Sequence, residues 1–227
     1  MTFFEEIYEA TKAEREEFQS IPFIREAVTG GLSHESYVAF LKQAYHHVRH
    51  TTPLLMAAGA KTPDRLEWMR KYLAEYIEEE IGHDEWILND IAACGFDAEE
   101  VRRSEPAFST ELMVAYLYDT INRKNPLGLF GMVYVLEGTS SKIATEAANA
   151  IQKRLGLPDK AFTYLTSHGE LDQEHIKFFE KIMNMLEEES DKACVIHCAK
   201  AIYRLYGDIF RSLPLTAGEP KSKAATA

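Results

Sequence analysis

The chain has 227 residues, of which 46% are hydrophobic and 27% are charged, and its formal net charge is −11. A chain of this length and composition buries enough apolar surface for one compact domain without disulfide bonds. The acidic charge makes nucleic acid an unexpected partner, since no Lys/Arg cluster that would neutralise phosphates occurs outside the short Lys221 and Lys223 pair near the end.

The cysteines and the lack of long apolar segments indicate the cellular setting. Three cysteines, an odd number without disulfide-like spacing, favour a reducing compartment. Cys194, His197 and Cys198 resemble a metal-binding cluster. However, the two cysteines are at i and i+4 of an amphipathic helix, so we expect them to be small core residues. The start of the chain has no leader pattern, and no run reaches the roughly 18 apolar residues of a membrane span. We therefore expect a cytoplasmic protein without a membrane partner.

Helical periodicity extends through nearly the whole chain, and alternating strand-like runs are absent. Capping residues, prolines and glycines set the expected helix limits. In chain order, the predicted helices are Thr2 to Gln19, Pro22 to Gly30, one capped by Ser33 and bent at Pro53, Thr62 to Cys94, a short helix from Asp97, Ser109 to Asn122, one opened by Asn125 and Pro126, Pro158 to Glu188, and Ser190 to Leu213. They predict a single all-α domain over residues 1–215 and a flexible tail over residues 216–227.

The long helix that begins at Thr62 carries a first pair of candidate ligands. Glu80 and His83 are at i and i+3, so they share a helix face and can bind one metal, as an inward-pointing Glu and His do in di-iron bundles. Glu79 is the substitute for Glu80. Gly82 costs about 1 kcal/mol relative to Ala inside a helix, which indicates either a bend near the site or a close helix contact. A solvated run of glutamates is the alternative interpretation.

Glu137 lies near the end of the most apolar run of the sequence, Leu127 to Gly138. Burying a carboxylate among such neighbours is costly unless a cation or strong hydrogen-bond donors compensate it. A metal ion is one such partner. The alternative is a Glu at a solvated helix turn, paired with Lys142 or with the hydroxyl of Ser140 or Ser141.

A third segment places His168, Asp172 and His175 at i, i+4 and i+7 of one helix. At about 100° per residue, the three side chains fall within roughly 60° of one another on one face. A solvated polar face has the same pattern, but three segments together offer carboxylates and imidazoles without thiolates. That set suits iron, or manganese as the alternative, better than structural zinc. The three helices must be neighbours in one bundle for these residues to meet.

These residues resemble the heme-oxygenase-like di-iron oxidases, part of a wider group that includes thiaminase II and pyrroloquinoline quinone synthase. The resemblance runs from Pro22 to Phe210, and its specific part is the order of ligand-bearing helices: an acid with a His, then a Glu, then HxxxDxxH. It implies a heme-oxygenase-like bundle of seven or eight helices and a centre of two Fe ions without heme. It also implies O2-dependent oxidation of a small amino-acid-, fatty-acid- or aminobenzoate-related molecule.

Carried over residue by residue, the resemblance implies the metal ligands Glu80, His83, Glu137, His168, Asp172 and His175. Members of the family place the first carboxylate at different offsets before the His, and here Tyr76 stands seven residues before His83. Glu137 would bridge the two ions. Glu137, Tyr134 and Tyr164 are the predicted catalytic residues, because each tyrosine lies about one turn before a ligand and would face the same cavity. An external electron donor is an optional partner, and a homodimer is expected.

Several alternatives remain open. His46, His47 and His50 offer a substrate-binding group or a further ligand, although core-edge histidines are the plainer interpretation. One branch of the family consumes its own tyrosine to make p-aminobenzoate. A metal-free thiaminase II-like hydrolase would need a nucleophilic Cys facing the cavity and an acid on the last helix, for which Asp208 is the candidate. A non-catalytic binding protein of the same fold is the third class, and it would leave a costly cluster of buried carboxylates.

Overall fold

The computed structural model describes residues 1–216, apart from the side chains of residues 168–174, and its regular elements are all helices. This confirms the predicted all-α class. The α-helices are α1 (Phe3–Ala10), α2 (Lys12–Gln19), α3 (Pro22–Thr29), α4 (His34–Val48), α5 (Thr51–Lys61), α6 (Glu67–Glu80), α7 (His83–Ala93), α8 (Ala98–Arg103), α9 (Phe108–Asp119), α10 (Leu129–Leu155), α11 (Thr163–Met183) and α12 (Glu189–Ser212). The predicted tail, residues 217–227, lies outside the described part.

Many helix ends lie where local chemistry predicts them. Pro22 occupies the first turn of α3, and Gly30 ends that helix with a φ of 76°. The Ser33 hydroxyl accepts the backbone N–H of Ser36 at the start of α4. The Asp97 carboxylate accepts two backbone N–H groups at the start of α8. These contacts satisfy groups that a helix end leaves without a partner inside the helix.

Two helices that were expected to be continuous are divided. Thr11 separates α1 from α2, and its hydroxyl donates to the carbonyl of Ile7 instead of extending into solvent. The expected bend at Pro53 is replaced by a break before it, because α4 ends at Val48 and α5 starts at Thr51. Pro53 then lies in the first turn of α5, where its missing N–H costs no hydrogen bond. Breaks of this kind raise the number of separate helices above the seven or eight expected.

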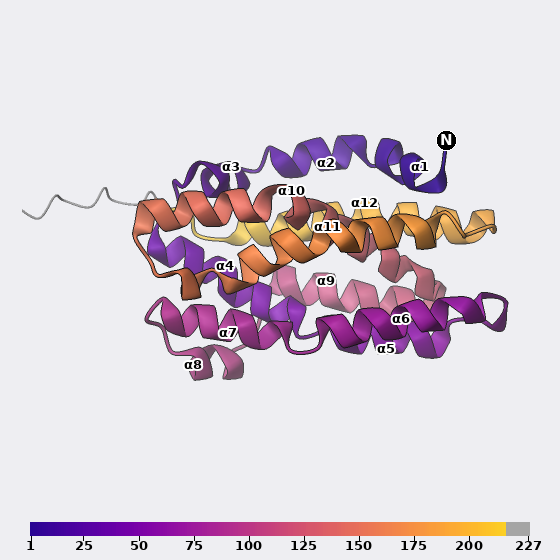
Figure 1. Cartoon of the computed structure of the whole chain (residues 1–227), viewed down its shortest axis with the longest axis horizontal. Coiled ribbons are helices and arrows are strands. Elements are labelled where there is room, and N and C mark those ends of the chain that lie inside the picture. The colour runs from indigo at the N-terminus through magenta and orange to yellow at the C-terminus, as the bar shows by residue number, and fades with distance from the viewer. Residues whose placement is uncertain (217–227) are drawn as a thin grey trace, which may run out of the picture.

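The long helix predicted from Thr62 to Cys94 is also broken, beside the candidate ligands. α6 ends at Glu80, and Gly82, with a φ of 90°, precedes α7. A Cβ at Gly82 would meet no atom within 4 Å, so the glycine is explained by its left-handed backbone and not by close packing. Figure 1 shows α6 and α7 following one another along the lower edge of the bundle with this break between them.

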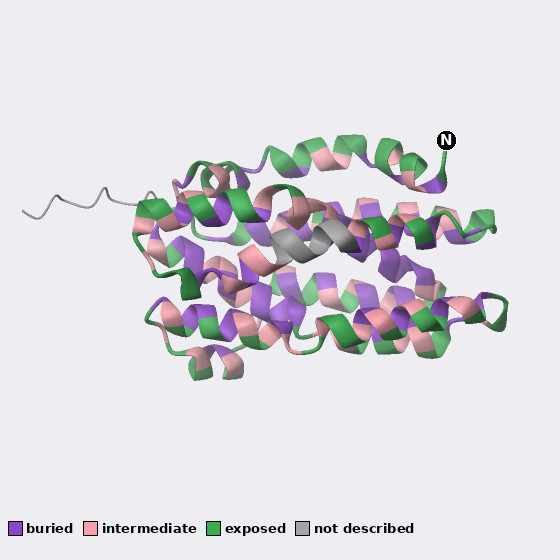
Figure 2. Cartoon of the chain, viewed as in Figure 1, coloured by how far each residue is buried: buried purple, intermediate pink, exposed green. Residues whose placement is uncertain are grey.

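The long helices α10, α11 and α12 form the centre of the bundle, and α10 packs against both of the others and against α3 (Figure 1). α10 and α12 approach closely at Gly131, where an added Cβ would lie 2.5 Å from the backbone nitrogen of Ala199. Figure 2 shows buried residues concentrated on the inward faces of these helices. The core extends from Phe3 to Leu213, and Glu137 of α10 and His175 of α11 are buried polar residues within the bundle.

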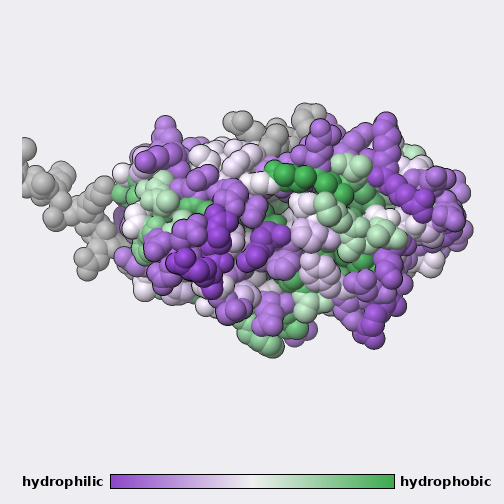
Figure 3. All heavy atoms as spheres, turned by 90° about the horizontal axis from the view of Figure 1, so that it is seen from below, coloured by the Kyte–Doolittle hydropathy of each residue, from purple (hydrophilic) through white to green (hydrophobic). Residues whose placement is uncertain are grey.

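The surface is mostly polar. Figure 3 shows one face on which hydrophilic residues predominate and hydrophobic residues form smaller patches between them. Among the described helices, none combines the length and the apolar character that crossing a bilayer requires.

Candidate metal centre

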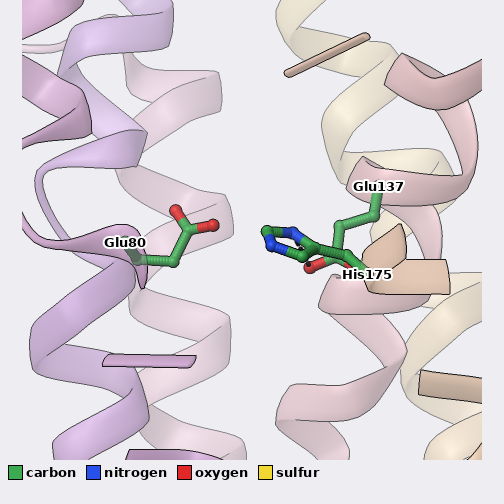
Figure 4. Close-up of side chains that lie close together, drawn as sticks. All are labelled: Glu80, Glu137 and His175. Atoms are coloured by element: carbon green, nitrogen blue, oxygen red, sulfur yellow. Dashed lines mark ion pairs between the residues drawn. The ribbon is translucent and has the colours of Figure 1, made fainter. Parts of the chain in front are cut away.

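Three candidate ligands from three helices converge in the bundle. One ligand atom from each of Glu80, Glu137 and His175 lies within 4.8 Å of the other two. Glu80 ends α6, whereas Glu137 and His175 come from the middle of α10 and α11. In Figure 4 the Glu80 carboxylate faces the other two side chains across the space between these helices. The left-handed Gly82 changes the direction of the chain directly after Glu80, where α6 ends.

His83 and Glu79 surround this cluster. His83 is buried at the start of α7, where its Nδ1 lies 3.1 Å from Oε2 of Glu80 and its ring stacks on Trp86. Oε2 of Glu79 lies 3.0 Å from Nε2 of His175. The Glu79 side chain is 52% exposed and that of Glu80 only 9%, so Glu80 is the inner carboxylate of the two.

Glu137 is buried and has contacts with a histidine and a tyrosine. Its Oε1 lies 3.6 Å from Nδ1 of His175, and its Oε2 accepts a hydrogen bond from the phenol of Tyr76 at 3.5 Å. The alternative pairing with Lys142 does not occur, because the Lys142 ammonium lies over the ring of Tyr8 instead. The Ser140 hydroxyl donates to backbone carbonyls, first to that of Leu136.

The start of α11 is held by a carboxylate from α7. Asp90 is fully buried and accepts the backbone N–H of Tyr164 at 2.9 Å and that of Thr163 at 3.1 Å, with a further short contact from the Thr163 hydroxyl. Burial raises the pKa of Asp90, and these hydrogen bonds act in the opposite direction. Asp90 thereby fixes the first turn of α11, the helix that contains His175.

Two predicted ligands on α11, His168 and Asp172, lie outside the described residues. Their roles stay predictions. Sequence reasoning did not include Tyr76 among the site residues, although its place seven residues before His83 was the available signal.

Two neighbouring cavities, which we call the near and far lobes, share part of their lining, and the near one includes residues of the cluster. The near lobe, about 70 Å³, is lined by Glu80, Glu137 and Tyr76 together with mostly apolar side chains. The far lobe has a similar volume of about 70 Å³ and is lined mainly by aliphatic and aromatic residues, most of them from α3, α10 and α12. The lobes share three hydroxyl-bearing residues, Ser140, Tyr164 and Tyr206. The only charged side chains in the described lining of either lobe are the two glutamates.

The two tyrosines predicted as catalytic residues, Tyr134 and Tyr164, lie in different cavities. Tyr164 lines both lobes, as expected from its position on α11. Tyr134 does not face the Glu137 cavity: its hydroxyl lies 3.4 Å from that of Thr11, and it lines another cavity beside Tyr8 and Arg15. Tyr134 and Glu137 are three residues apart on α10, and the Tyr134 ring meets Phe4 of α1 edge to face instead of entering the Glu137 cavity.

The three histidines near the end of α4 lie outside the cluster. His46 bonds to the hydroxyl of Ser104, and His50 bonds to that of Tyr118. His47 contacts the edge of the Tyr206 ring. Because α4 ends between His47 and His50, the two do not share a helix face.

The groups needed for thiol-based hydrolysis are also elsewhere. None of the three cysteines lines either lobe. Burial raises the pKa of the Cys94 and Cys198 thiols to about 12 and raises that of Cys194 as well, so the thiolate nucleophile is disfavoured. Asp208 forms an ion pair with Arg211 in a separate surface groove.

The described donors fit a hard or borderline metal ion. Two carboxylates and two imidazoles gather without a thiolate among them, which is the ligand chemistry of iron and manganese. A cation there would compensate the burial of Glu137 and Glu80, which carboxylates packed against one another cannot do for themselves.

Solved structures share this fold. A domain of unknown function with a heme oxygenase-like fold from Shewanella denitrificans matches with a TM-score of 0.83 and 23% identity, covering 93% of this chain and 91% of that one. A TenA homologue from Pseudomonas syringae matches with a TM-score of 0.78 and 12% identity over 92% and 91% of the two chains. Heme oxygenase-1 from Synechocystis, in complex with heme, matches with a TM-score of 0.73 and 13% identity over 93% and 91%.

These likenesses show a heme-oxygenase-like fold, as the family resemblance implied. No curated protein matches the chain. Residues 38–207, which include the three converging side chains, match the sequence profile of a family described as iron-containing redox enzymes, and the chain belongs to that family.

Proposed function

We propose that this protein is a non-heme di-iron oxidase that uses O2 to oxidise a small organic substrate. The observation that carries the proposal is the meeting of Glu80, Glu137 and His175 inside the bundle, within 4.8 Å of one another. The family is one of iron-containing redox enzymes, and these donors suit iron. A heme group would need one or two axial side chains and would leave two buried carboxylates without a use.

Each described residue has a place in this proposal. Glu80, His83, Glu137 and His175 would hold iron, with His168 and Asp172 as the remaining predicted ligands. Glu79 is placed to orient His175, because a carboxylate commonly holds the second nitrogen of a metal-bound histidine. Tyr76 donates to Glu137 and would limit the rotation of that carboxylate.

Iron bound at this site would supply the reduction of O2. Reducing O2 to two waters takes four electrons, so a two-electron oxidation of the substrate leaves two electrons for an external donor. The residues of the chain provide binding, orientation and shielding from water. A substrate in the near lobe would lie beside Glu80 and Glu137, and the hydroxyl-bearing residues Ser140, Tyr164 and Tyr206 line both lobes.

The cavity also restricts the reacting part of the substrate. The described lining of both lobes contains no basic side chain that could bind a carboxylate, and apart from Thr139 and Ser140 the far lobe is aliphatic and aromatic. We infer that the substrate enters with an uncharged apolar group, and that any charged group it carries stays outside these lobes.

Metal loading tests the proposal directly. The protein is loaded anaerobically with Fe(II), freed of excess metal and analysed for iron, and then exposed to an O2 pulse while its visible absorption is followed. We expect about two irons per chain and a transient absorption band. Glu137→Gln, which preserves the shape of the side chain, should lose most of the iron.

The control is Glu146→Gln, an exposed residue on the same helix, which should bind iron like the unmodified protein. Equal iron content in the Glu137→Gln and Glu146→Gln variants would show that the assigned site does not hold the metal.

A further inference from the structure

A second cavity lies behind the candidate metal centre. Its volume is about 230 Å³, and its lining includes Tyr8, Arg15, Tyr134, Lys142 and Tyr203. In Figure 1, α1 and α2 lie on one side of α10 and α11, and α6 lies on the other side. Residues of α1, α2, α10, α11 and α12 line the cavity. We call it the rear cavity. Its lining also contains Gly138 and Ile176, which directly follow Glu137 and His175 in the sequence, so the two sites lie back to back across α10 and α11.

Two positive charges face the rear cavity. The guanidinium carbon of Arg15 lies 3.7 Å from the centre of the Tyr8 ring, and the ammonium of Lys142 lies 5.2 Å from it. Arg15 donates to the carbonyl of Tyr8 at 3.0 Å and to the hydroxyl of Thr11 at 3.4 Å. Neither cation forms an ion pair with a carboxylate of the described residues, although the chain contains 36 acidic and only 25 Lys and Arg residues.

The other walls are aromatic. Tyr134 and Tyr203 are buried, with their rings edge to face at 6.5 Å, and Phe4 packs edge-on against Tyr134. Burial raises the pKa of both phenols, so each keeps its proton at neutral pH and can donate a hydrogen bond. The cavity therefore combines aromatic surfaces with cations at one side.

We propose that the rear cavity binds a small aromatic carboxylate of about the size of benzoate, with its carboxylate at Arg15 and Lys142 and its ring among the tyrosines. A cavity of about 150 Å³ lined by apolar residues accommodates benzene, so the larger rear cavity has room for a ring with a carboxylate. A carboxylate satisfies two cations with its two oxygens. Inorganic phosphate should bind less well, because it has more charge and more oxygen atoms than the two cations can neutralise and because the aromatic walls offer it no ring to pack against. This proposal does not depend on the di-iron assignment.

Isothermal titration calorimetry on the full chain tests this assignment. Metal is first removed by chelation, so that no probe can bind to iron. The probes are benzoate, benzyl alcohol, which has the ring without the charge, and inorganic phosphate. We expect saturable binding of one benzoate per chain and at least tenfold weaker binding of the other two probes. Arg15→Met and Lys142→Met should each weaken benzoate binding by about tenfold or more, the effect of losing one charge-assisted hydrogen bond.

The matched control is Lys12→Met, which removes the same charge one turn before Arg15 on α2. Lys12 is exposed and lies 4.0 Å from Glu16, outside the rear cavity, so benzoate binding should stay within about twofold. Lys142 is exposed, and its variant is expected to fold like the unmodified chain. Arg15→Lys, which keeps the charge, should recover part of the affinity lost in Arg15→Met.

Three outcomes would overturn the proposal. In the first, benzoate shows no saturable binding to the unmodified chain. In the second, the affinity for benzoate is the same in Lys142→Met as in Lys12→Met. In the third, phosphate would bind as tightly as benzoate, which would identify a general anion site.

Discussion

The phenol of Tyr76 donates a hydrogen bond to Oε2 of Glu137 at 3.5 Å, and this contact joins α6 to the middle of α10. The same ring meets His175 edge to face, with 5.8 Å between the ring centres. Tyr76 thus touches two members of the candidate metal cluster from a third helix. Its ring is fully buried, so its contribution to packing can be separated from that of its hydroxyl.

Tyr76→Phe should leave the fold intact and weaken iron binding. Loss of one hydrogen bond costs about 1 kcal/mol of unfolding free energy. Loss of a partner that orients a metal ligand typically costs about 10- to 100-fold in metal affinity. Iron titration and urea unfolding measure the two effects. Tyr118→Phe, which removes a hydroxyl bonded to His50 away from the cluster, should change only stability, and equal iron affinities in the two variants would contradict the role of Tyr76.

Asp90→Ala should disturb both stability and the metal centre. It removes the acceptor of the first N–H groups of α11, which should lower the free energy of unfolding by about 2 kcal/mol. The start of α11 would then shift, and iron content should fall. Asp97→Ala is the matched control, because Asp97 caps α8 away from the cluster and should cost about 1 kcal/mol without loss of iron. An Asp90→Ala variant with full iron content would show that α11 is positioned by other contacts.

Gly82→Ala tests the break beside Glu80 and His83. A residue with a Cβ at a φ of 90° is strained by about 1 to 2 kcal/mol, so the substitution should lower stability and displace His83. Gly95 has a φ of 86° and, like Gly82, has no atom within 4 Å of an added Cβ. Gly95→Ala should therefore cost the same stability but keep the iron. Unfolding and iron analysis of both variants distinguish strain in general from strain at the site.

The stability of the metal-free protein should fall as the pH is lowered through about 6.5. Burial, together with the charge of Arg49, lowers the pKa of His46 and of His50 below the usual value. The unfolded chain takes up protons on these groups at a pH where the folded chain does not, so stability present above the unfolded pKa is lost as the pH falls toward the folded pKa. Urea unfolding at pH 7.5 and 5.5 measures the difference. His46→Gln should reduce it, whereas the exposed control His197→Gln should leave it unchanged.

Local chemistry determined much of the fold. Proline in the first turn of α3, glycine after that helix, and the Ser33 and Asp97 caps act through contacts within a few residues, so the sequence predicts them directly. The sequence also named Glu80, through its i, i+3 spacing to His83, and Glu137, because a carboxylate in an apolar run requires a partner wherever the chain folds.

The remaining features depend on which helices become neighbours. Tyr134 and Glu137 are one turn apart on α10, yet α1 draws the phenol toward the rear cavity while α6 and α11 meet the carboxylate. The cap that Asp90 of α7 gives to α11 likewise joins segments distant in the sequence. Helical periodicity says which residues share a face, but only the packing of the whole bundle selects the neighbour that each face meets.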